Sequence, residues 1–386
     1  MTREPAIASK RIHAWERNLL ILVMFLQVPS LLGAYPPRLD NPVREPGQFQ
    51  FQLQGETLGV YIVETSTNLL DWVTVATNQV RESQRVISLP TIGSQTYVRA
   101  IRSPSNISRF ALAVDAGIEL NGNDLVVDSY DSTDPLHSTP DGLYDPATAT
   151  DAAELAWHDG LTNAAGVGSL TLFGALNTPG AGIFNLGPAG TVGTRFWVEA
   201  GNVGVQPAHL FTNLVMAFPE VGPPFTGGAF IPSPGIIDGE LYDYVLNSGH
   251  YQMSSLNMSG AKKMGITGQA TLYLTGSLSQ SGTSRITILP GASLRLYIGG
   301  SSAVFGGAGV INPFGPEQVS LFCLPTVHSL HLPLSSGSMS ARVYAPATDI
   351  TLGNTNSVVD FSGSVTARSV TLQGPVRMHQ DLGFPR

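Results

Sequence analysis

The second half of the chain combines short alternating apolar segments with very few charges, and its turns recur at a near-regular spacing. Leu272–Leu274 and Leu296–Ile298 share an apolar-Tyr-apolar pattern 24 residues apart, and Ser-Gly turns at 259–260 and 281–282 are 22 residues apart. A coil of parallel strands uses about this length, because parallel strands need a crossover of roughly a dozen or more residues between them. The spacing therefore predicts a parallel β-helix or solenoid over residues 251–386, with a β-sandwich as the alternative arrangement of such short strands.

Alternating apolar residues in this half predict which side chains face the interior of the coil. Gly and Asn between the segments suit the sharp corners of such a coil. Cys323, the only cysteine of the chain, lies in the apolar run 319–324 and is predicted to be a buried strand residue. The predicted inward positions are Leu256, Met258, Leu272, Leu274, Ile286, Ile288, Leu294, Leu296, Ile298, Leu330, Leu332, Val343, Ile350, Leu352, Val358, Val365, Val370 and Leu372.

The first 34 residues have the pattern of a secretory signal peptide. Basic residues from Arg3 to Arg17 precede the apolar run 19–26, and the small pair Gly33-Ala34 offers a cleavage site. An uncleaved membrane anchor is the alternative, but Pro29 interrupts the run well before the ~20 apolar residues that a spanning helix needs. We therefore expect an exported protein located outside the cell, on its surface or in the periplasm, with no membrane span after removal of the signal peptide.

Composition excludes two classes of protein. With 20 Lys and Arg against 28 Asp and Glu, the chain carries a formal net charge of −8 and would repel phosphate backbones, so nucleic-acid binding is not expected. Disorder is not expected either, since 42% of the residues are apolar.

Between the signal peptide and the coil, the sequence predicts three further segments. Residues 35–46 carry four prolines and are predicted to be an extended linker. Residues 47–108 hold five short β-type runs, which predict a small antiparallel β-sandwich with Tyr61 and Trp72 as core candidates. Residues 109–250 are predicted to be an acidic, Gly- and Pro-rich β region leading into the solenoid, with one short helical turn over 151–159.

The acidic region contains a candidate calcium site. No Lys or Arg occurs from residue 110 to 194, and Asp128, Asp131 and Asp134, with Asn123, carry oxygens of the kind that calcium binds. The alternative is a solvated loop in which Asp and Asn side chains cap turns. The spacing matches no EF-hand loop or regular calcium repeat, so we expect at most a structural calcium ion and no other cofactor.

Two parts of the chain resemble families of exported bacterial proteins. Residues 63–75 with Tyr-Val-Arg-Ala at 97–100 resemble a short β module that is common in exported bacterial proteins, which implies a structural or interaction role. Residues 259–276, 289–300, Arg-Val-Tyr-Ala-Pro at 342–346, the closing His379-Gln380-Asp381 and the upstream Asp-Ser-Tyr-Asp-Ser at 128–132 resemble an uncharacterised exported domain family seen in pilus-assembly-like and cell-surface proteins. Gln380 stands where many relatives carry Tyr. This second resemblance implies a β-helical surface module and no known chemistry.

Complete catalytic motifs are absent from the sequence. No Gly-x-Ser-x-Gly stands at a strand-to-helix turn, and His328 and His331 have no third ligand in a recognisable zinc pattern. The enzymatic alternative is a polysaccharide hydrolase or lyase in which Asp360 and Asp381, 21 residues apart, lie side by side with Arg368 nearby.

From these observations we predict an all-β, exported, non-catalytic structural or adhesive protein, with surface glycans or other envelope proteins as partners. The alternative is a carbohydrate-binding or polysaccharide-degrading β-helix protein, in which exposed Tyr and Phe side chains on one face of the coil hold glycan chains. The sequence does not indicate the ligand or the oligomeric state.

Overall fold

The computed structural model divides the chain into two compact units, Met1–Ser105 and Asn106–Arg386, which are described separately. It describes residues 38–45, 48–54, 60–66, 73–79, 84–90, 97–102, 110–158, 161–162, 168–179, 185–212, 214, 216, 218–227, 229–334 and 337–383. Among these residues nearly all regular structure is β, and the helical segments are α1 (Arg195–Glu199) and the 3-10 helix η2 (Pro316–Gln318). The prediction of an all-β chain with antiparallel and then parallel sheets is confirmed.

The predicted signal peptide, residues 1–34, lies outside the described residues. Within the described part of the chain, no helix is both long enough and apolar enough to cross a membrane.

The first unit contains two antiparallel sheets that share one apolar core. One sheet has the order β1 (Arg38–Glu45), β2 (Gln48–Gln54), β5 (Gln84–Pro90), and the other has the order β4 (Val73–Gln79), β3 (Val60–Ser66), β6 (Tyr97–Arg102). The core is Leu39, Phe49, Phe51, Leu53, Val63, Ile87, Leu89 and Val98. The side chains of Tyr61 and Trp72, the predicted core candidates, lie outside the described part.

The linker predicted over 35–46 is wrong for residues 38–45, which form strand β1. Leu39 is buried in the core, and burial of an apolar side chain favours pairing with β2 over an extended linker. Pro42 is tolerated because β1 is an edge strand whose register shifts between Asp40 and Val43, where Asn41 has a φ of 51°.

Parallel strands of the second unit stack in three ladders. The first ladder runs through β17 (Gly249–Met253), β20 (Gln269–Leu274), β23 (Ser293–Ile298), β26 (Val319–Cys323), β28 (Ser338–Leu352), β29 (Val359–Leu372), β7 (Leu112–Glu119), β9 (Ala153–Trp157), β11 (Leu170–Asn177) and β14 (Leu210–Phe211). The second ladder runs through β18 (Leu256–Met258), β21 (Leu278–Gln280), β24 (Ser302–Phe305), β27 (Ser329–Leu332), the later parts of β28, β29 and β7, and β10 (Leu161–Thr162).

The third ladder consists of two stretches. One contains β16 (Glu240–Leu246), β19 (Lys263–Ile266), β22 (Arg285–Ile288) and β25 (Val310–Ile311), with β15 (Ser233–Ile237) antiparallel to β16 at its end. The other contains the early parts of β28 and β29, then β30 (Val376–Asp381), β8 (Leu125–Tyr130), the early part of β11, β12 (Thr191–Gly193) and β13 (Gly204–Val205).

The observed register confirms the parallel pairing that the repeated apolar-Tyr-apolar pattern predicted. Leu272 pairs with Leu296, and Leu296 pairs with Leu321, so apolar side chains stack on the inside of successive strands. Gly260 and Gly282, at the repeated Ser-Gly turns, both have positive φ and lie against each other. The prediction that Val358 faces the interior is wrong, because its side chain is 45% exposed and lies directly before β29.

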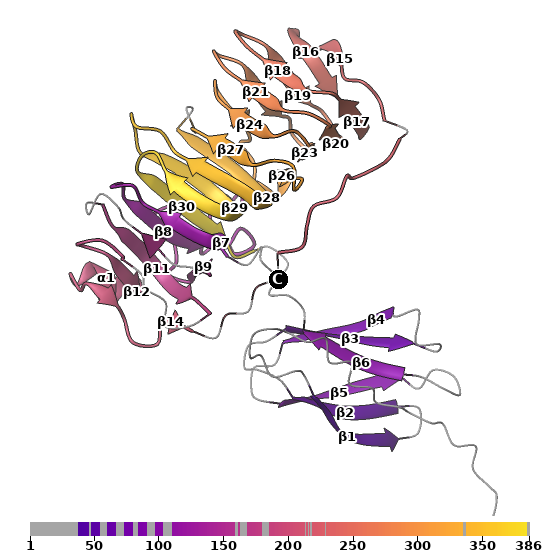
Figure 1. Ribbon diagram of the computed structural model, residues 1–386, viewed down its shortest axis with the longest axis vertical. Helices are drawn as coiled ribbons and strands as arrows, with labels where there is room; N and C mark the ends of the chain where they lie inside the picture. The colour runs from indigo at the N-terminus through magenta and orange to yellow at the C-terminus, as the bar shows by residue number, and fades with distance from the viewer. Residues whose placement is uncertain are drawn as a thin grey trace, which may run out of the picture. The chain divides into compact units, whose positions relative to one another are not determined.

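The order of the strands in space differs from their order along the chain. Strands β7 and β8, near the start of the unit, pair with β29 and β30, near its end, as Figure 1 shows where yellow strands lie beside purple ones. Parallel pairings join β29, β30, β8, β11, β9 and β7 into a closed circuit of six strands. The segment after β14 then returns along the side of the unit to β15 at the other end of the stack (Figure 1).

The short helical turn predicted over 151–159 is wrong, because residues 153–157 form strand β9. Leu155 and Trp157 are fully buried, and β9 is held between β7 and β11. Burial between two strands outweighs a weak local helix preference.

An aromatic row lies on the outer side of the first ladder. Tyr273, Tyr297, Phe322 and Tyr344 are register neighbours on four successive strands, and each is partly buried. The rings of Tyr297 and Phe322 stack with centroids 4.5 Å apart. Segment 218–227 covers the two ends of the row, where the ring of Phe225 contacts Tyr273 and the hydroxyl of Tyr344 donates a 2.8 Å hydrogen bond to the carbonyl of residue 219.

Candidate functional site

A group of interacting polar side chains in the second unit lies where β8, near the start of the unit, meets β30, near its end. In the third ladder, β30 pairs in parallel with β8, so that His379 lies opposite Asp128, Gln380 opposite Ser129 and Asp381 opposite Tyr130. The two sequence segments that resemble an uncharacterised domain family, 128–132 and 379–381, are therefore direct neighbours. We call this region the strand junction.

His379 bridges two carboxylates at the strand junction. Its Nδ1 lies 2.7 Å from Oδ1 of Asp128 on β8, and its Nε2 lies 3.1 Å from Oδ1 of Asp360 on β29. The side chains of His379 and Asp128 are 5% and 9% exposed, whereas that of Asp360 is 44% exposed. Both ring nitrogens are thus engaged, one toward the interior and one toward the surface.

Tyr144 and Arg195 complete the surroundings of Asp128. The ring of Tyr144 stacks on His379 with centroids 3.6 Å apart, and its hydroxyl donates a 2.8 Å hydrogen bond to Oδ2 of Asp128. A guanidinium nitrogen of Arg195, in α1, lies 3.7 Å from the same oxygen, while the guanidinium lies over the ring of Phe173. These contacts leave both oxygens of Asp128 next to positive or donor groups.

Charge interactions shift the pKa values of this group. Burial lowers the pKa of His379, but its hydrogen bonds to Asp128 and Asp360 outweigh burial and raise the pKa above its usual value. The hydrogen bond to His379 lowers the pKa of Asp360. Burial and the carboxylate of Asp128 raise the pKa of Tyr144, so its hydroxyl remains a donor at neutral pH. The structure thus favours a charged imidazolium between two carboxylates.

The remaining residues of the closing motif also connect separate segments. Oε1 of Gln380 accepts a 2.7 Å hydrogen bond from the backbone N–H of Glu154. Oδ1 of Asp381 accepts hydrogen bonds from the backbone N–H groups of Ser132 at 3.0 Å and Gly383 at 2.9 Å. Burial raises the pKa of Asp381. Each residue of the motif therefore contributes a side-chain contact that holds β30 in place.

The arrangement suits joining strands better than turning over a substrate. A general base needs a nitrogen or oxygen within hydrogen-bond reach of the substrate proton. At the strand junction the imidazole is buried, covered by the Tyr144 ring, and hydrogen-bonded through both nitrogens.

The structure does not bring the predicted calcium ligands together. Asp128 lies in the strand junction, whereas Asp131 and Asp134 accept hydrogen bonds from the backbone N–H groups of Thr133 and Leu136, which are turn contacts. The side-chain amide of Asn123 donates to the carbonyl of Leu120. Over the described ranges, no group of three or more His, Cys, Asp or Glu side chains is placed to hold a metal ion. Calcium binding stays a prediction.

The predicted carboxylate pair for sugar chemistry is also separated. Asp360 faces His379, and the register places it opposite Arg377, whereas Asp381 lies farther along β30 opposite Tyr130. Arg368 forms an ion pair with Asp349. Cys323 is buried as predicted, and burial raises its pKa to about 12, which keeps the thiol protonated.

The sequence analysis named His379 as part of the closing motif, but it did not find Tyr144 or Arg195. Tyr144 and Arg195 carried no motif that could have found them, since their role depends on folding next to Asp128. The signal for the strand junction was the joint presence of segments 128–132 and 379–381 in one resemblance, which indicates related positions in space but no particular contact.

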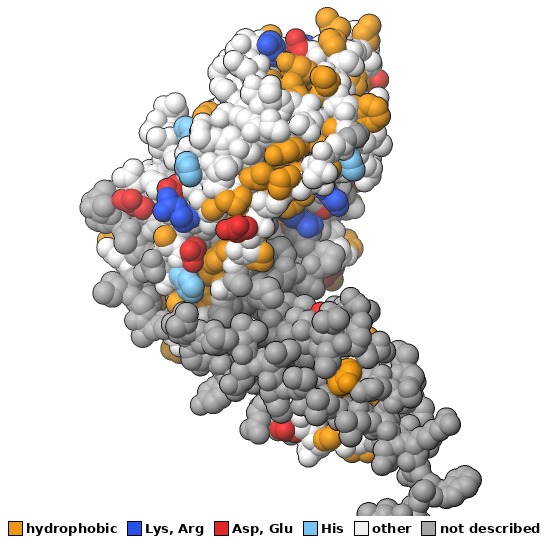
Figure 2. Space-filling view, turned by 45° about the vertical axis from the view of Figure 1, so that its right-hand side comes forward, with side chains coloured by type: hydrophobic (Ala, Val, Ile, Leu, Met, Phe, Trp, Pro, Cys, Tyr) orange, Lys and Arg blue, Asp and Glu red, His pale blue; other side chains and the backbone are white. Residues whose placement is uncertain are grey.

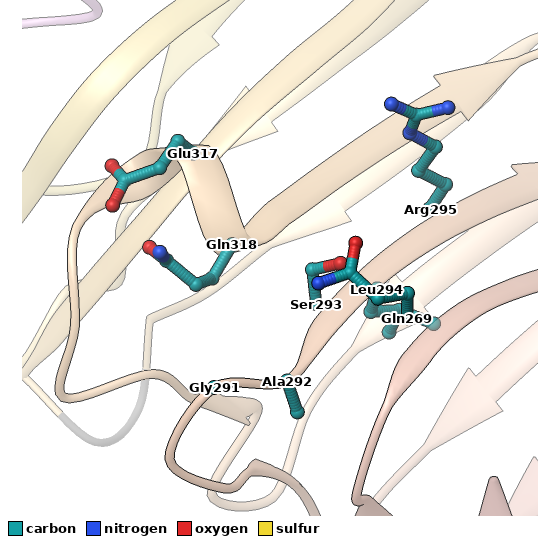
Figure 3. A pocket seen from close by; sticks show the side chains of 8 residues that line it. All are labelled: Gln269, Gly291, Ala292, Ser293, Leu294, Arg295, Glu317 and Gln318. Atoms are coloured by element: carbon teal, nitrogen blue, oxygen red, sulfur yellow. The ribbon is translucent and has the colours of Figure 1, made fainter. Parts of the chain in front are cut away.

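A second candidate site is a polar pocket beside the aromatic row, with a cavity volume of about 280 Å³. Figure 3 shows Glu317 and Gln318 on η2 along one side of it, with the polar ends of both side chains turned away from Arg295, and Gln269, Ser293 and Arg295 along the other side. We call it the η2 pocket. It is lined by Gln269, Gly291, Ala292, Ser293, Leu294, Arg295, Glu317 and Gln318.

Comparison with known proteins gives no function for this chain. Residues 237–383 match a domain of unknown function (DUF7305). This agrees with the predicted resemblance to an uncharacterised domain family, and the matched range contains the closing motif but not residues 128–132. No curated protein and no solved structure matches the chain.

Proposed function

We propose that the chain is an exported, non-catalytic structural or adhesive protein of the cell surface, the periplasm or the extracellular space, and that its second unit is a solenoid-like scaffold. The observation that carries the proposal is the strand junction, where the ionisable side chains of His379 and Asp128 are buried between strands and hydrogen-bonded to each other. Groups that are hydrogen-bonded to one another in a closed site hold the fold together and are poorly placed to act on a substrate.

The solenoid-like description is supported by the ladders. Each turn of the chain between β17 and β27 adds one strand to the first ladder and one to the second, in constant register. The interior is one continuous apolar core, which a single turn could not bury alone.

The surface supports a scaffold as well. Figure 2 shows a face on which charged side chains are scattered, and a band of hydrophobic side chains runs among other side chains and backbone. A surface of this kind suits contacts with envelope proteins or glycans.

A second candidate function, carbohydrate binding, is favoured by the aromatic row and by the polar pocket beside it. Tyr side chains present an apolar ring with a polar end, which suits contact with sugars.

Turnover measurements test the non-catalytic proposal. The purified chain is incubated with plant and algal polysaccharides while reducing ends and unsaturated products are recorded, alongside Asp360→Ala and His379→Gln. We expect no product above buffer from any of the three proteins. Product formation by the unchanged chain that either variant abolishes, without a change in unfolding midpoint, would show that the chain is an enzyme.

Cell fractionation tests the location. In the native host, we expect an antibody against the chain to detect it in the periplasmic, surface or culture fraction, with residues 1–34 absent from the mature N-terminus. Recovery of the full-length chain from the cytoplasm alone would contradict export.

A further inference from the structure

A proline-rich segment of the chain lies over the aromatic row of the second unit. Residues 218–227 read Phe-Pro-Glu-Val-Gly-Pro-Pro-Phe-Thr-Gly. They form no backbone–backbone hydrogen bond with any described residue, whereas the strands of the row pair with one another in constant register. Contacts of side chains therefore seat this segment, and the backbone pairing under the row does not depend on it. We call residues 218–227 the covering segment.

Burial in the covering segment repeats every three residues. Val221 is 8% exposed, and Phe218 and Pro224 are partly buried, whereas the residues between them are exposed. A polyproline II helix has three residues per turn, so one residue in three faces the surface beneath it. Its rise of about 3.1 Å per residue gives roughly 19 Å from residue 218 to 224, and four neighbouring strands span about 14 Å. The segment is therefore long enough to pass over the whole row.

The two ends of the covering segment meet the two ends of the row. On β28, the hydroxyl of Tyr344 donates a 2.8 Å hydrogen bond to the carbonyl of Pro219, and Tyr344 and Phe218 pack against the same apolar cluster. Burial raises the pKa of Tyr344 to about 12, so its hydroxyl remains a donor at neutral pH. On β20, the ring of Phe225 packs edge-on against Tyr273 with centroids 6.0 Å apart.

These contacts indicate the kind of ligand that fits the row. Aromatic-lined grooves bind proline-rich segments, because prolines hold the chain extended before binding and so reduce the entropy lost on binding. The peptide seated on this row has apolar residues three apart, prolines at exposed positions between them, and one carbonyl bonded to a ring hydroxyl. The contacts seen on the row are therefore those of an extended peptide, and a sugar chain is the alternative that the experiment separates.

We propose that the aromatic row is a docking groove for a proline-rich extended segment of another exported protein. The covering segment is an internal ligand of the same kind, which the partner's segment replaces. This inference rests on the proposed structural or adhesive function and names the class of partner. A segment of the same chain competes at an effective concentration of about millimolar, so the partner's segment has to bind more tightly than the internal one.

Peptide binding to the full chain tests the groove. The probe is a fluorescent synthetic peptide of residues 218–227, and its anisotropy is measured with the unchanged chain and with Val221→Ser/Phe225→Ala, the opened variant. Both replacements lie in the covering segment and leave the row unaltered. We expect the opened variant to bind the probe, and the unchanged chain to bind it measurably but at least tenfold more weakly, because its own segment competes.

Variants of the row separate specific docking from general effects. Tyr273→Ala, added to the opened variant, should weaken the probe at least tenfold, and Tyr344→Phe, which removes only the hydroxyl, at least threefold. Gly222→Ala in the unchanged chain is the control within the covering segment, since nothing lies within 4 Å of its Cβ position, and it should bind within twofold of the unchanged chain. Unfolding midpoints are measured, so that loss of binding is read only on folded protein.

Altered probes test the spacing and the prolines. A peptide with Ser in place of Val221 and Phe225 should bind the opened variant at least tenfold more weakly, because it lacks two of the apolar anchors. A peptide with Ala in place of its three prolines should bind at least threefold more weakly, because it is less extended before binding.

The proposal is overturned if the opened variant does not bind the probe at millimolar concentration, or if the row variants and altered probes bind as the originals do. Tighter binding of cellohexaose than of the probe would make the row a glycan groove instead. Dimerisation of the opened variant alone, in gel filtration at micromolar concentration, would make a second copy the occupant. A probe that binds the opened variant but never the unchanged chain would overturn replacement by a partner.

These outcomes are distinguishable from failure of the proposed function. Loss of the docking groove would leave the non-catalytic function and export intact, since those rest on turnover and location. Product formation from a polysaccharide would overturn the non-catalytic function and leave the peptide result standing.

Discussion

At the scale of single residues, His379 makes the strand junction sensitive to pH. Folding raises the pKa of His379, so its stabilisation is complete below the unfolded value of about 6.5 and is lost as the pH rises through the folded value. Folding lowers the pKa of Asp360, whose contribution is present above about 3.9 and is lost as the pH falls through its folded value. The stabilisation from this contact is therefore greatest between about pH 3.9 and about pH 6.5, the two unfolded pKa values.

We predict that the free energy of unfolding falls as the pH rises from about 6 to about 9, by about 1.4 kcal/mol for each unit by which folding raises the pKa of His379. Asp128 and Asp360 contact its ring nitrogens and Tyr144 stacks on the ring, while Arg195 lies next to Asp128 and Arg377 is the register neighbour of Asp360. Urea unfolding at a series of pH values measures this slope. His379→Gln should flatten the slope, and an unchanged slope in that variant would contradict the assignment.

The two carboxylates provide a matched control for this contact. Removing the buried partner with Asp128→Ala leaves Nδ1 of the buried imidazole without its hydrogen-bond partner and should cost about 3 kcal/mol at neutral pH. The partner in Asp360→Ala is largely exposed, so that variant should cost less than about 1 kcal/mol. Equal losses would mean that the exposed side of His379 matters as much as the buried one.

At the scale of elements, long strands such as β29 turn a corner without leaving the sheet, and Gly363 makes this turn. Its φ is 127°, and an added Cβ would lie 2.1 Å from the carbonyl oxygen of Ala341 on β28. Gly363→Ala should therefore lower the free energy of unfolding by more than about 1 kcal/mol. Gly222→Ala is the control, since nothing lies within 4 Å of its Cβ position. A loss for Gly222→Ala equal to that for Gly363→Ala, in thermal unfolding, would contradict this reading.

Local patterns predicted elements whose partners are one turn away. The Leu-Tyr-Leu segment of β20 and its counterpart in β23 share an alternating pattern and a fixed spacing, and they pair in the expected register. Patterns of this kind do not report long-range pairing, so the alternation of residues in segment 125–130 did not indicate that β8 lies beside β30. The proline content of residues 35–46 predicted a linker, but residues 38–45 form strand β1 because Leu39 is buried in the core. The strand junction could be predicted only as a pair of related motifs.

At the scale of the second unit, two groups of strands from opposite ends of the sequence are held together across β7–β29 and β8–β30. The covalent connection between them, after β14, runs over the outer side of the first ladder and contacts it through Phe225 and the carbonyl of Pro219. The pairing of the strands, and not this connection, therefore carries most of the cohesion between the two groups.

This view predicts that the unit survives a cut in its connection. A site for a specific protease is placed in residues 221–226, and the chain is cleaved after folding. Because two parallel pairings and the buried Asp128–His379 contact remain, the fragments should elute together in gel filtration at micromolar concentration and unfold in one transition. Cleavage combined with Asp128→Ala should promote separation, because it removes the buried contact between β8 and β30. Fragments of the otherwise unchanged chain that separate under native conditions would show that the connection, and not the ladder, holds the two groups together.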